Sequence, residues 1–501
     1  MFNVIKKQYL KHTTCLLIVI GLLLGGCSIT RSLVSTRAVA VETISLAPSS
    51  EPQKIITTNS LDENHTSNPD VIIEIDDAKP GQLMDGIGGA FNEQGWDALL
   101  SLSPSERQLV LENLFNVKNG ANLCFNRIPI GASDFALSAY SLDDTKDDWP
   151  LKNFSIKRDE SCMIPYIKAA QQINPRMKFH ASPWSPPGWM KTNGSQTGGG
   201  ELLGDNRTLQ THAHYLVKFL KAYEGHHIFI DRLCPQNEPL VSGSYPGCKI
   251  PASLYCRAVT EFIIPAVKKA GLKTRVWAGT FNYWKADTRK HFEAIFASEQ
   301  MNRAIGGISF QYSNIDWVKQ YHEKYPAVSM QHSESECYNG ANAKVEVLRD
   351  FQDYIAYTRA GCGLFTFWNM VLPEPHTSTW GWSQNSLVTI DKKKKSVQYE
   401  PSYALARFLG HHVIAGSHYL PARITKGDSL IGDLNFAPKD CVKFMHTELA
   451  KGEQVAAFIK PNGNIVVFLL NQGGAVTAKL KTGHKSVEVT LPAESLVAAV
   501  F

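Results

Sequence analysis

Two glutamates in the middle of the chain follow short apolar stretches and could perform acid–base chemistry. Glu238 ends the stretch that begins at Ile230, and Glu334 ends the stretch that begins at Val328. A facing pair of carboxyl groups suits glycoside hydrolysis, because one must protonate the departing oxygen while the other attacks the anomeric carbon. Burial and mutual repulsion can separate the two pKa values into these roles. Either glutamate alone would more often be an ion-pair partner, so the prediction depends on their meeting.

Side chains suited to sugar binding stand at the ends of neighbouring apolar stretches. Asp134 could accept hydrogen bonds from paired hydroxyls, and Arg127 lies near the end of the stretch before it. The rings of Trp184, Tyr312 and Trp368 could pack on the apolar face of a pyranose. Each tryptophan could equally belong to a hydrophobic core. Their common position at the ends of such stretches favours a sugar pocket.

The stretches themselves predict the scaffold. The chain has 501 residues, 44% of them hydrophobic and 19% charged, which is enough for more than one folded domain. Between residues 84 and 402, short apolar runs alternate with amphipathic segments, and this pattern is typical of βα repeats. The eight predicted strands are Met84–Phe91, Leu123–Ile130, Lys178–Trp184, Ile230–Glu238, Arg275–Asn282, Gly307–Tyr312, Val328–Glu334 and Leu364–Met370. We therefore expect an α/β fold, a (β/α)8 TIM barrel with its active site at the carboxyl ends of the strands.

Beyond the barrel the pattern changes to strands. After about residue 402, apolar and polar residues alternate without a helical period, which predicts an antiparallel β-sandwich over 403–501. Its expected strands are Gln454–Ile459, Asn464–Leu470, Ala475–Leu480, Ser486–Leu491 and Ser495–Phe501. A lone strand at Val71–Ile75, in the segment 71–83, cannot be stable by itself, so we expect it to pair into that sandwich.

The N-terminal 26 residues have the form of an export signal. Basic residues precede the apolar stretch Leu16 to Leu24, and Gly25, Gly26 and Cys27 follow it. This end resembles the bacterial lipobox, which implies lipidation of Cys27 and a membrane-anchored lipoprotein of the cell envelope, at the outer membrane or cell surface. An ordinary secretory signal would instead give a secreted protein. Residues 27–70 are polar and lack a period, so we expect a flexible tether.

Six motifs together resemble glycoside hydrolase family 30, the glucosylceramidase family, from about residue 71 to the end. They occur in the family's order, each at its expected strand: Asp85–Phe91, Arg127–Ile130, Ala181–Pro187, Asn237–Pro239, Ser333–Glu334 and Trp368–Met370. The resemblance implies a retaining β-glycosidase built from a (β/α) barrel and a side β-sandwich. It also implies that the strand before the barrel belongs to that sandwich.

The resemblance assigns roles to individual residues. Glu238 matches the acid/base, Asn237 the residue that hydrogen-bonds the sugar 2-hydroxyl, and Glu334 the nucleophile. The residues that match the pocket for the terminal glucose are Asp134, Trp184 and Trp368.

Two departures from the family pattern leave questions open. A second glutamate, Glu336, stands two residues after Glu334 and could share its face of a strand. We choose Glu334, because Met330 to Glu334 align with the strand without a gap. The segment Thr377–Asn385 resembles the branch of the family that includes bacterial β-1,6-glucanases more than the animal lysosomal enzyme. Its two tryptophans are Trp380 and Trp382.

Composition and spacing argue against other classes of function. The formal charge is +5, and three of these charges lie in the first 26 residues; no basic stripe remains, so we expect no nucleic-acid partner. Three closely spaced histidine pairs lack ligand geometry, and we expect no metal or other cofactor. The cysteines beyond Cys27 match no zinc pattern and are expected to be mainly buried thiols, with some pairing left open. Lys392–Lys395 is interpreted as a solvated hairpin turn, and Gly198–Gly200 as a rim loop.

The expected substrate is a β-linked glucoside, either glycolipid or glucan. Glucosylceramide and β-1,6-glucan both remain candidates, as do β-xylosides and β-fucosides. A catalytically silent carbohydrate-binding lipoprotein on the same scaffold is the alternative from another class. Neither the mode of cleavage, endo or exo, nor the oligomeric state follows from the sequence.

Overall fold

The structure is a computed structural model, and it describes residues 39–45, 68–241, 243–282, 286–335, 339–427, 453–483 and 485–501. All of these belong to one compact unit that spans Ala38–Phe501. The predicted signal peptide with Cys27, and the alternative nucleophile Glu336, lie outside the described residues.

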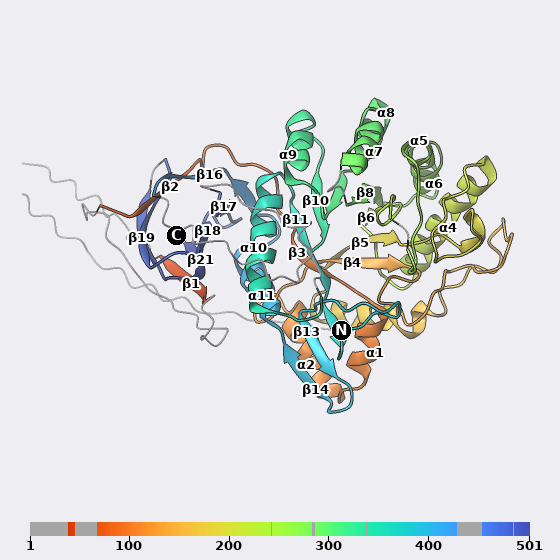
Figure 1. The fold of residues 1–501 in the computed structure, drawn as a ribbon, viewed down its shortest axis with the longest axis horizontal. Helices are drawn as coiled ribbons and strands as arrows, with labels where there is room; N and C mark the ends of the chain where they lie inside the picture. Colours follow the sequence, from red (N-terminus) through yellow and green to blue (C-terminus); the bar gives the residue numbers. More distant parts are fainter. Residues whose placement is uncertain are drawn as a thin grey trace, which may run out of the picture. The chain divides into compact units, whose positions relative to one another are not determined.

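A barrel of parallel strands forms the larger part of this unit, with one strand in each predicted apolar stretch (Figure 1). In chain order the strands are β3 (Gly86–Ala90), β4 (Phe125–Ile130), β5 (Lys178–Pro183), β6 (Arg232–Leu233), β7 (Arg275–Val276) continued by β8 (Ala278–Phe281), β9 (Ile308–Gln311), β10 (Met330–Glu334) and β11 (Leu364–Asn369). Hydrogen bonds join them as β11-β3-β4-β5-β6-β7 and β8-β9-β10. A parallel bridge between Met330 and Cys362 links β10 to the segment that enters β11. The predicted (β/α)8 barrel is confirmed.

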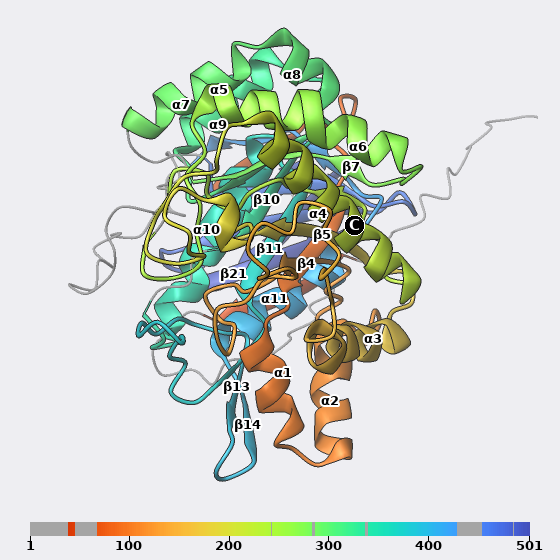
Figure 2. The ribbon, with the colours of Figure 1, turned by 90° about the vertical axis from the view of Figure 1, so that its right-hand side faces the viewer.

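Helices surround these strands, as Figure 2 shows in a view along the barrel. They are α1 (Glu93–Leu100), α2 (Pro104–Phe115), α3 (Met163–Ile173), α4 (Asn206–Gly225), α5 (Ala252–Arg257), the π-helical η3 (Ala258–Ile263), α6 (Ile264–Lys269), α7 (Ala286–Phe296), α8 (Glu299–Ala304), α9 (Ile315–Lys324), α10 (Lys344–Arg359) and α11 (Pro401–His412). Helix α2 begins with a reciprocal cap, in which the Ser103 side chain accepts from the Glu106 backbone and the Glu106 side chain from the Ser103 backbone. Such a capping box, with Pro104 at the first helical position, fixes where a helix starts.

The sandwich consists of two sheets with the strand orders β1-β21-β18-β17-β15 and β16-β2-β19-β20. Its strands are β1 (Ala40–Ser45), β2 (Val71–Ile75), β15 (His418–Leu420), β16 (Ala422–Lys426), β17 (Val455–Ile459), β18 (Ile465–Asn471), β19 (Val476–Lys481), β20 (Ser486–Leu491) and β21 (Ser495–Val500). Strand β2 pairs antiparallel with β16 and parallel with β19, so the segment before the barrel does join the sheet formed after it. Alternate side chains of both sheets meet in an apolar core.

Two expectations about this part of the chain are wrong. Residues 40–45 lie in the predicted tether, yet they form β1 and pair antiparallel with β21. Val41 and Ile44 are buried there, but one short strand in a polar stretch gives too weak a period to recognise. The region after residue 402 also contains a helix, because α11 spans the predicted boundary. Its buried residues Leu405 and Leu409 pack in the same core as the barrel helices.

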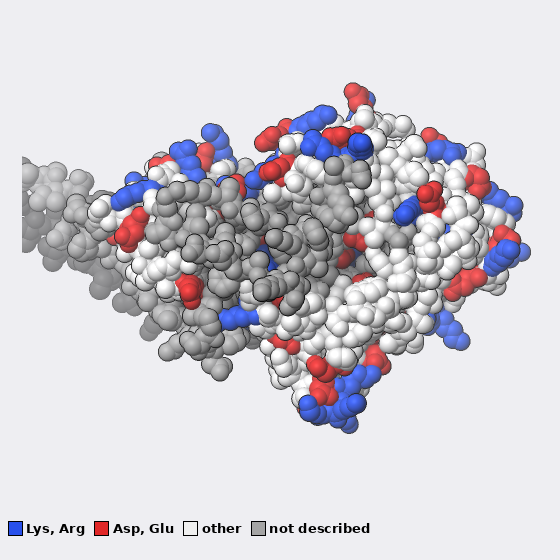
Figure 3. Space-filling view, in the orientation of Figure 1, with Lys and Arg blue, Asp and Glu red and all other residues white. Residues whose placement is uncertain are grey.

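A small sheet adjoins the carboxyl end of β11. It has the order β12 (Val371–Pro373), β13 (Val388–Asp391) and β14 (Ser396–Tyr399). The turn between β13 and β14 contains Lys392–Lys395, as predicted for a hairpin. Lys392 forms an ion pair with Asp97, and Lys394 pairs with Asp391 at 3.0 Å. On the face seen in Figure 3, basic and acidic side chains are likewise interspersed.

The cysteines of the described part are unpaired: Cys124, Cys162, Cys234, Cys248, Cys256 and Cys362. Four of them are buried, and burial raises the pKa of each of these thiols. Cys337 and Cys441 lie outside the described residues. Among the residues searched, helices long and apolar enough to cross a membrane are not found.

Candidate active site

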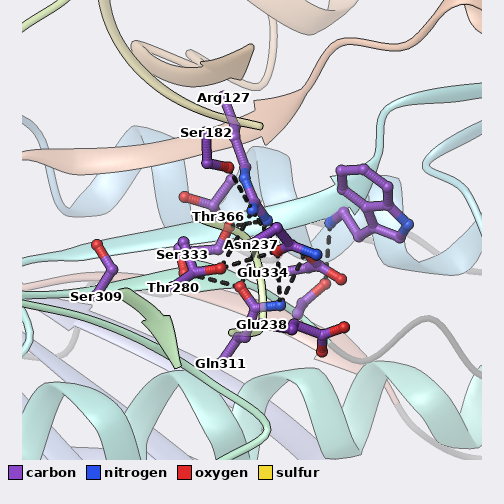
Figure 4. A network of polar contacts seen from close by, with 12 residues as sticks. Arg127, Ser182, Asn237, Glu238, Thr280, Ser309, Gln311, Ser333, Glu334 and Thr366 are labelled. Carbon is purple, nitrogen blue, oxygen red and sulfur yellow. Dashed lines mark hydrogen bonds and ion pairs between the residues drawn. The ribbon is translucent and has the colours of Figure 1, made fainter. Parts of the chain in front are cut away.

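The two predicted catalytic glutamates come together at the carboxyl ends of the barrel strands. Glu334 is the last residue of β10, and Glu238 follows β6 on the loop that leaves the fourth strand. Both side chains are buried, with exposed fractions of 6% and 9%. Figure 4 shows them within one network of polar contacts that also contains Arg127, Asn237 and Gln311.

Three donors hold the carboxyl group of Glu334. The Tyr312 hydroxyl donates to Oε1 at 2.8 Å, and the Gln311 amide donates to Oε2 at 3.2 Å. The Arg127 guanidinium forms a buried ion pair with the same Oε2. Burial raises the pKa of Glu334, while these three donors act against the rise because each favours the ionised form. These three donors therefore favour the ionised form of Glu334.

Glu238 has a different environment. Burial raises the pKa of its carboxyl group, and the negative charge of Glu334 raises it further. The charge of Arg127 lowers this pKa, but Arg127 forms its ion pair with Glu334. The Tyr245 hydroxyl donates to Glu238 Oε2 at 3.4 Å. Burial and the charge of Glu334 therefore favour the protonated form of Glu238, while the bond from Tyr245 acts against this rise in pKa.

The backbone at Glu238 also departs from the ordinary. Its φ of 47° lies in the left-handed region, as does the φ of 45° at Tyr312 beside the other glutamate. Non-glycine residues adopt this region at a cost of about 1–3 kcal/mol, and such strain gathers at functional sites. Hydrogen bonds fix the loop, with Glu238 N donating to Thr280 O at 2.9 Å and Asn237 N to Pro183 O at 2.7 Å. The strained turn thereby fixes the direction in which the Glu238 side chain leaves the backbone.

Arg127 does not have the predicted substrate-binding position. Its side chain is fully buried, and its Nη2 donates to Asn237 Oδ1 at 2.7 Å and to Ser182 Oγ at 2.8 Å, while Nη1 faces Glu334. The guanidinium lies 4.5 Å from the ring centre of Trp184. We therefore correct its role to positioning. An inward-pointing side chain three residues before the end of β4 lies below the mouth of the barrel, and the sequence does not reveal this depth.

Hydrogen bonds to the side-chain oxygen of Asn237 fix its amide group. Oδ1 accepts from Arg127 at 2.7 Å, from Thr280 Oγ1 at 2.8 Å and from Gln311 Nε2 at 3.3 Å. Because three donors face Oδ1, the orientation of the amide is fixed and its nitrogen points away from them. The Asn237 amide is therefore arranged to donate to a ligand.

Asp134 lies on the loop after β4, close to both glutamates. Burial raises the pKa of its carboxyl group well above the usual value, and the charges of Glu334 and Glu238 raise it further. Its Oδ1 is buried without a partner in the described structure. A buried acceptor without a partner is costly, and a sugar hydroxyl would satisfy it.

The predicted aromatic residues meet beside this carboxyl group. The rings of Trp184 and Trp368 stack with centroids 5.2 Å apart and planes 25° apart, and Phe135 packs in the same cluster. Trp368 Nε1 donates to Gln384 Oε1 at 2.9 Å. Both indoles are almost fully buried, so their packing on a sugar stays a prediction.

Several functional candidates were missed from sequence. Gln311 directly precedes Tyr312 at the end of β9 and bridges Glu334 to Asn237. The sequence places Gln311 at a strand end, but an uncharged amide at that position does not by itself indicate a functional residue. Tyr245 lies on a glycine-rich loop after β6, and nothing in that loop pointed to Glu238. The described residues contain no group of three or more histidines, cysteines or carboxylates that could hold a metal.

A (β/α)8 barrel with two buried glutamates at the ends of its fourth and seventh strands defines a class, the glycoside hydrolases. Comparison with known families agrees. The model described as the glycosyl hydrolase family 30 TIM-barrel domain matches residues 84–346, and the model of that family's β-sandwich domain matches 444–498. The chain belongs to glycosyl hydrolase family 30.

Individual relatives fall into two groups by name. A putative glucosylceramidase 1 of Caenorhabditis elegans is 27% identical over 421 residues, covering 81% of this chain and 77% of the relative. An endo-1,6-β-D-glucanase of Aspergillus fumigatus is 26% identical over 445 residues, covering 82% and 84%. Putative glucosylceramidase 3 of Caenorhabditis elegans is 39% identical over 181 residues, which is 36% of this chain and only about a third, 34%, of that protein.

Solved structures share the fold over nearly the whole chain. SrfJ from Salmonella typhimurium superposes with a TM-score of 0.81 at 21% identity, covering 93% of this chain and 99% of that one. An endo-β1,6-glucanase superposes with a TM-score of 0.76 at 22% identity and the same coverage. At these identities the likeness concerns the fold.

Proposed function

We propose that this hydrolase is a retaining β-glycosidase that cleaves β-linked glucosides by double displacement. The observation that carries the proposal is the asymmetry of the buried pair. Glu334 is hydrogen-bonded by three donors, one of them a guanidinium, whereas burial and the neighbouring charge favour the protonated form of Glu238. One carboxylate and one carboxylic acid in one site are what the first chemical step requires.

In the first step Glu334 attacks the anomeric carbon of the sugar. As the carbon–oxygen bond to the leaving group breaks, the departing oxygen takes the proton of Glu238. The Asn237 amide donates to the 2-hydroxyl, where such contacts strengthen in the transition state. Asp134 accepts from other hydroxyls. The product is a glycosyl ester on Glu334 and a free leaving group.

In the second step Glu238 acts as the base. Its carboxylate removes a proton from a water molecule whose oxygen attacks the anomeric carbon, and the ester bond to Glu334 breaks. Glu238 is protonated again and Glu334 is ionised again, so the site returns to its starting state. Two inversions at one carbon give net retention.

For the leaving group we propose a glucose unit of a β-1,6-glucan. The half-buried Trp382 lies on the segment that resembles the glucanase branch, and its ring is 5.1 Å from that of Tyr245, which contacts the acid Glu238. An aromatic pair beside the acid offers a surface for a second sugar. The glucosylceramidase relatives support a second candidate, a glucosylceramide-type glycolipid.

A panel of aryl β-glycosides, β-1,6-glucan and glucosylceramide tests this function on the purified protein. We expect hydrolysis of β-glucosides with the β-anomer formed first by NMR, and loss of glucan cleavage in Glu238→Gln. Formation of the α-anomer first would contradict retention. Binding of these sugars without hydrolysis of any of them would instead favour the silent binding protein.

We also propose that the protein is exported and anchored through a lipid on Cys27. The support is the sequence Leu24-Gly25-Gly26-Cys27 after an apolar stretch. Mass spectrometry of the membrane fraction should find acyl chains on this cysteine and none in Cys27→Ser. A wild-type protein free of lipid would contradict the anchor.

A further inference from the structure

A second pocket opens on the rim of the barrel, apart from the catalytic pair. Its volume is about 610 Å³, within the usual size of ligand sites. Its walls come from the loops that follow β4 and β5, which meet in front of the barrel in Figure 2. The lining residues used below are Ala139, Trp189, Lys191 and Gln196.

An indole with a fixed orientation forms one wall. Trp189 Nε1 donates to Asp143 O at 2.9 Å, and the Trp149 ring packs edge-on with centroids 5.1 Å apart. Trp189 is half-buried, so its polar atom is satisfied by the protein while part of its ring faces the pocket. A rigid aromatic surface of this kind suits the apolar face of a sugar.

Lys191, a buried residue, forms another part of the lining. Lys191 is 3% exposed, and its Nζ donates to Gln196 O at 3.1 Å and to Gly247 O at 2.6 Å. An ammonium has three N–H donors, so one is left for a further acceptor. The ion pairs found in the described part of the chain do not include Lys191. A sugar hydroxyl would accept this third bond without bringing a charge into the pocket.

The pocket is one loop away from the catalytic acid. Gly198 N donates to Gly243 O at 2.8 Å and Gly247 N donates to Gln196 O at 3.1 Å, so the loop 243–247 is tied to the pocket wall on both sides. Tyr245, in the middle of that loop, is the residue that donates to Glu238. A chain of sugars lying along this loop can therefore occupy both places.

We propose that the rim pocket binds a neutral glucose unit of the glucan, remote from the bond that is cleaved. The Trp189 ring packs on the sugar, and Lys191 donates to one of its hydroxyls. This inference rests on the proposed function, because it assigns the pocket to the same polymeric substrate. It predicts that the pocket matters only for substrates long enough to reach it.

Filling the pocket tests the proposal without removing any existing contact. Ala139 is exposed and lines the pocket, so Ala139→Trp should block it. The matched control is Ala475→Trp at an exposed alanine of the sandwich. We expect kcat/KM on β-1,6-glucan to fall about tenfold, a change worth about 1.4 kcal/mol, while kcat/KM on an aryl β-glucoside stays unchanged. The control should change neither value.

Two substitutions that remove the proposed sugar contacts, Trp189→Ala and Lys191→Met, provide a second measurement. The melting temperature of each variant is recorded to detect a loss of stability. A loss confined to long gluco-oligosaccharides supports the pocket. Equal losses on aryl glucoside and glucan, or no loss on glucan in any variant, would overturn it. If the wild type hydrolyses no β-glucoside, the proposed function fails. The pocket can then be tested by calorimetry, which measures binding of a β-1,6-linked gluco-oligosaccharide to the wild type and to Ala139→Trp. Loss of binding in the variant supports it, and equal binding contradicts it.

Discussion

The barrel and the sandwich bury different kinds of side chain at the same depth. The sandwich core consists of valine, isoleucine, leucine and alanine with one phenylalanine, Phe501, and members such as Val467 and Leu469 are fully buried. The barrel interior buries Arg127, Gln311 and Gln331 just as completely. A buried polar group costs free energy unless it is bonded, so each of these depends on its neighbours. The apolar core of the sandwich stabilises the folded chain, whereas the barrel interior positions charged and polar side chains.

This contrast gives each domain its own response to substitution. Shortening an apolar side chain in the sandwich leaves a cavity, which lowers the free energy of unfolding. Changing a polar group in the barrel alters the ionisation or orientation of a neighbour. Substitutions should therefore separate stability from catalysis by domain.

The largest effect is expected for Glu334→Gln. The amide cannot attack the anomeric carbon, and loss of a nucleophile in other hydrolases costs up to about 10⁶-fold in kcat. We expect a loss of at least about 10⁴-fold with the far-UV circular dichroism unchanged. Labelling of the wild type with a 2-fluoro glucoside and peptide mapping should place the covalent sugar on Glu334. Label on Glu336 would move the nucleophile by two residues.

The next effect belongs to Glu238→Ala. Removal of a general acid costs about 10²–10⁴-fold, but only where the leaving group needs a proton. We expect large losses on glucan and small ones on aryl glucosides with very good leaving groups. Added azide should restore turnover and give a β-glycosyl azide, identified by NMR. Appearance of the α-azide would assign the nucleophile's role to this residue instead.

A substitution in the sandwich core should lower stability and leave catalysis unchanged, the opposite of the glutamate variants. Leu469→Ala removes a fully buried side chain from the apolar core and is expected to cost about 2–5 kcal/mol in unfolding free energy. The kcat of the folded fraction should stay unchanged, because the sandwich contributes none of the named site residues. Denaturant unfolding and activity on the same sample check both statements. A fall in kcat of the folded enzyme would show that the two domains are coupled.

The smallest and most specific effect is expected for Gln311→Leu. This change removes a donor that favours the ionised form of Glu334 and also of Glu238, so the pKa of each should rise. The acid limb of kcat/KM against pH then moves to higher pH, since the nucleophile is protonated over a wider range. On the acid limb, where Glu334 is mainly protonated, we expect about a tenfold loss for a rise of about one pKa unit, equivalent to about 1.4 kcal/mol, and a smaller loss at neutral pH.

A matched control keeps this test specific. Gln331 is also fully buried in the barrel, but it bonds Arg232 at 2.6 Å and Ser309 at 2.6 Å rather than either glutamate. Gln331→Leu should lower the melting temperature and leave the acid limb in place. The same displacement of the limb in both variants would show a general effect of polarity in the barrel.

Much of the scaffold could be predicted because burial imposes a pattern on sequence. Each barrel strand is covered on both faces, so it appears as an apolar run that stops where its polar end reaches the mouth. This is why Glu238 and Glu334 could be placed from sequence. The sandwich strands alternate because each has one face on the core. Strand β1 was missed because one short strand in a polar stretch gives too weak a period, although Val41 and Ile44 are buried.

The rest of the site depends on contacts that no local pattern carries. The depth of Arg127, and with it the change from substrate binding to positioning, follows from how far β4 extends relative to β5 and β10. Tyr245 reaches Glu238 because of the path of a loop. Gln311 is recognisable only from its partners. Local sequence predicts which strand end a residue occupies, but not which neighbour it bonds.

The pairing of β1 and β2 has a consequence for the order of synthesis. Both strands precede the barrel in the chain, yet β1 pairs with β21 and β2 with β16 and β19, which follow it. The two parts of the sandwich therefore lie on either side of the barrel in the sequence. Their paired residues are separated by 347 positions for Ile75 and Ala422 and by 460 for Ala40 and Val500. Loop closure over such a distance is slow, and both early strands wait with unpaired edges until their partners exist. For β1 that moment comes only with residues 495–500, so a ribosome that stalls late would release a folded barrel beside an open sheet.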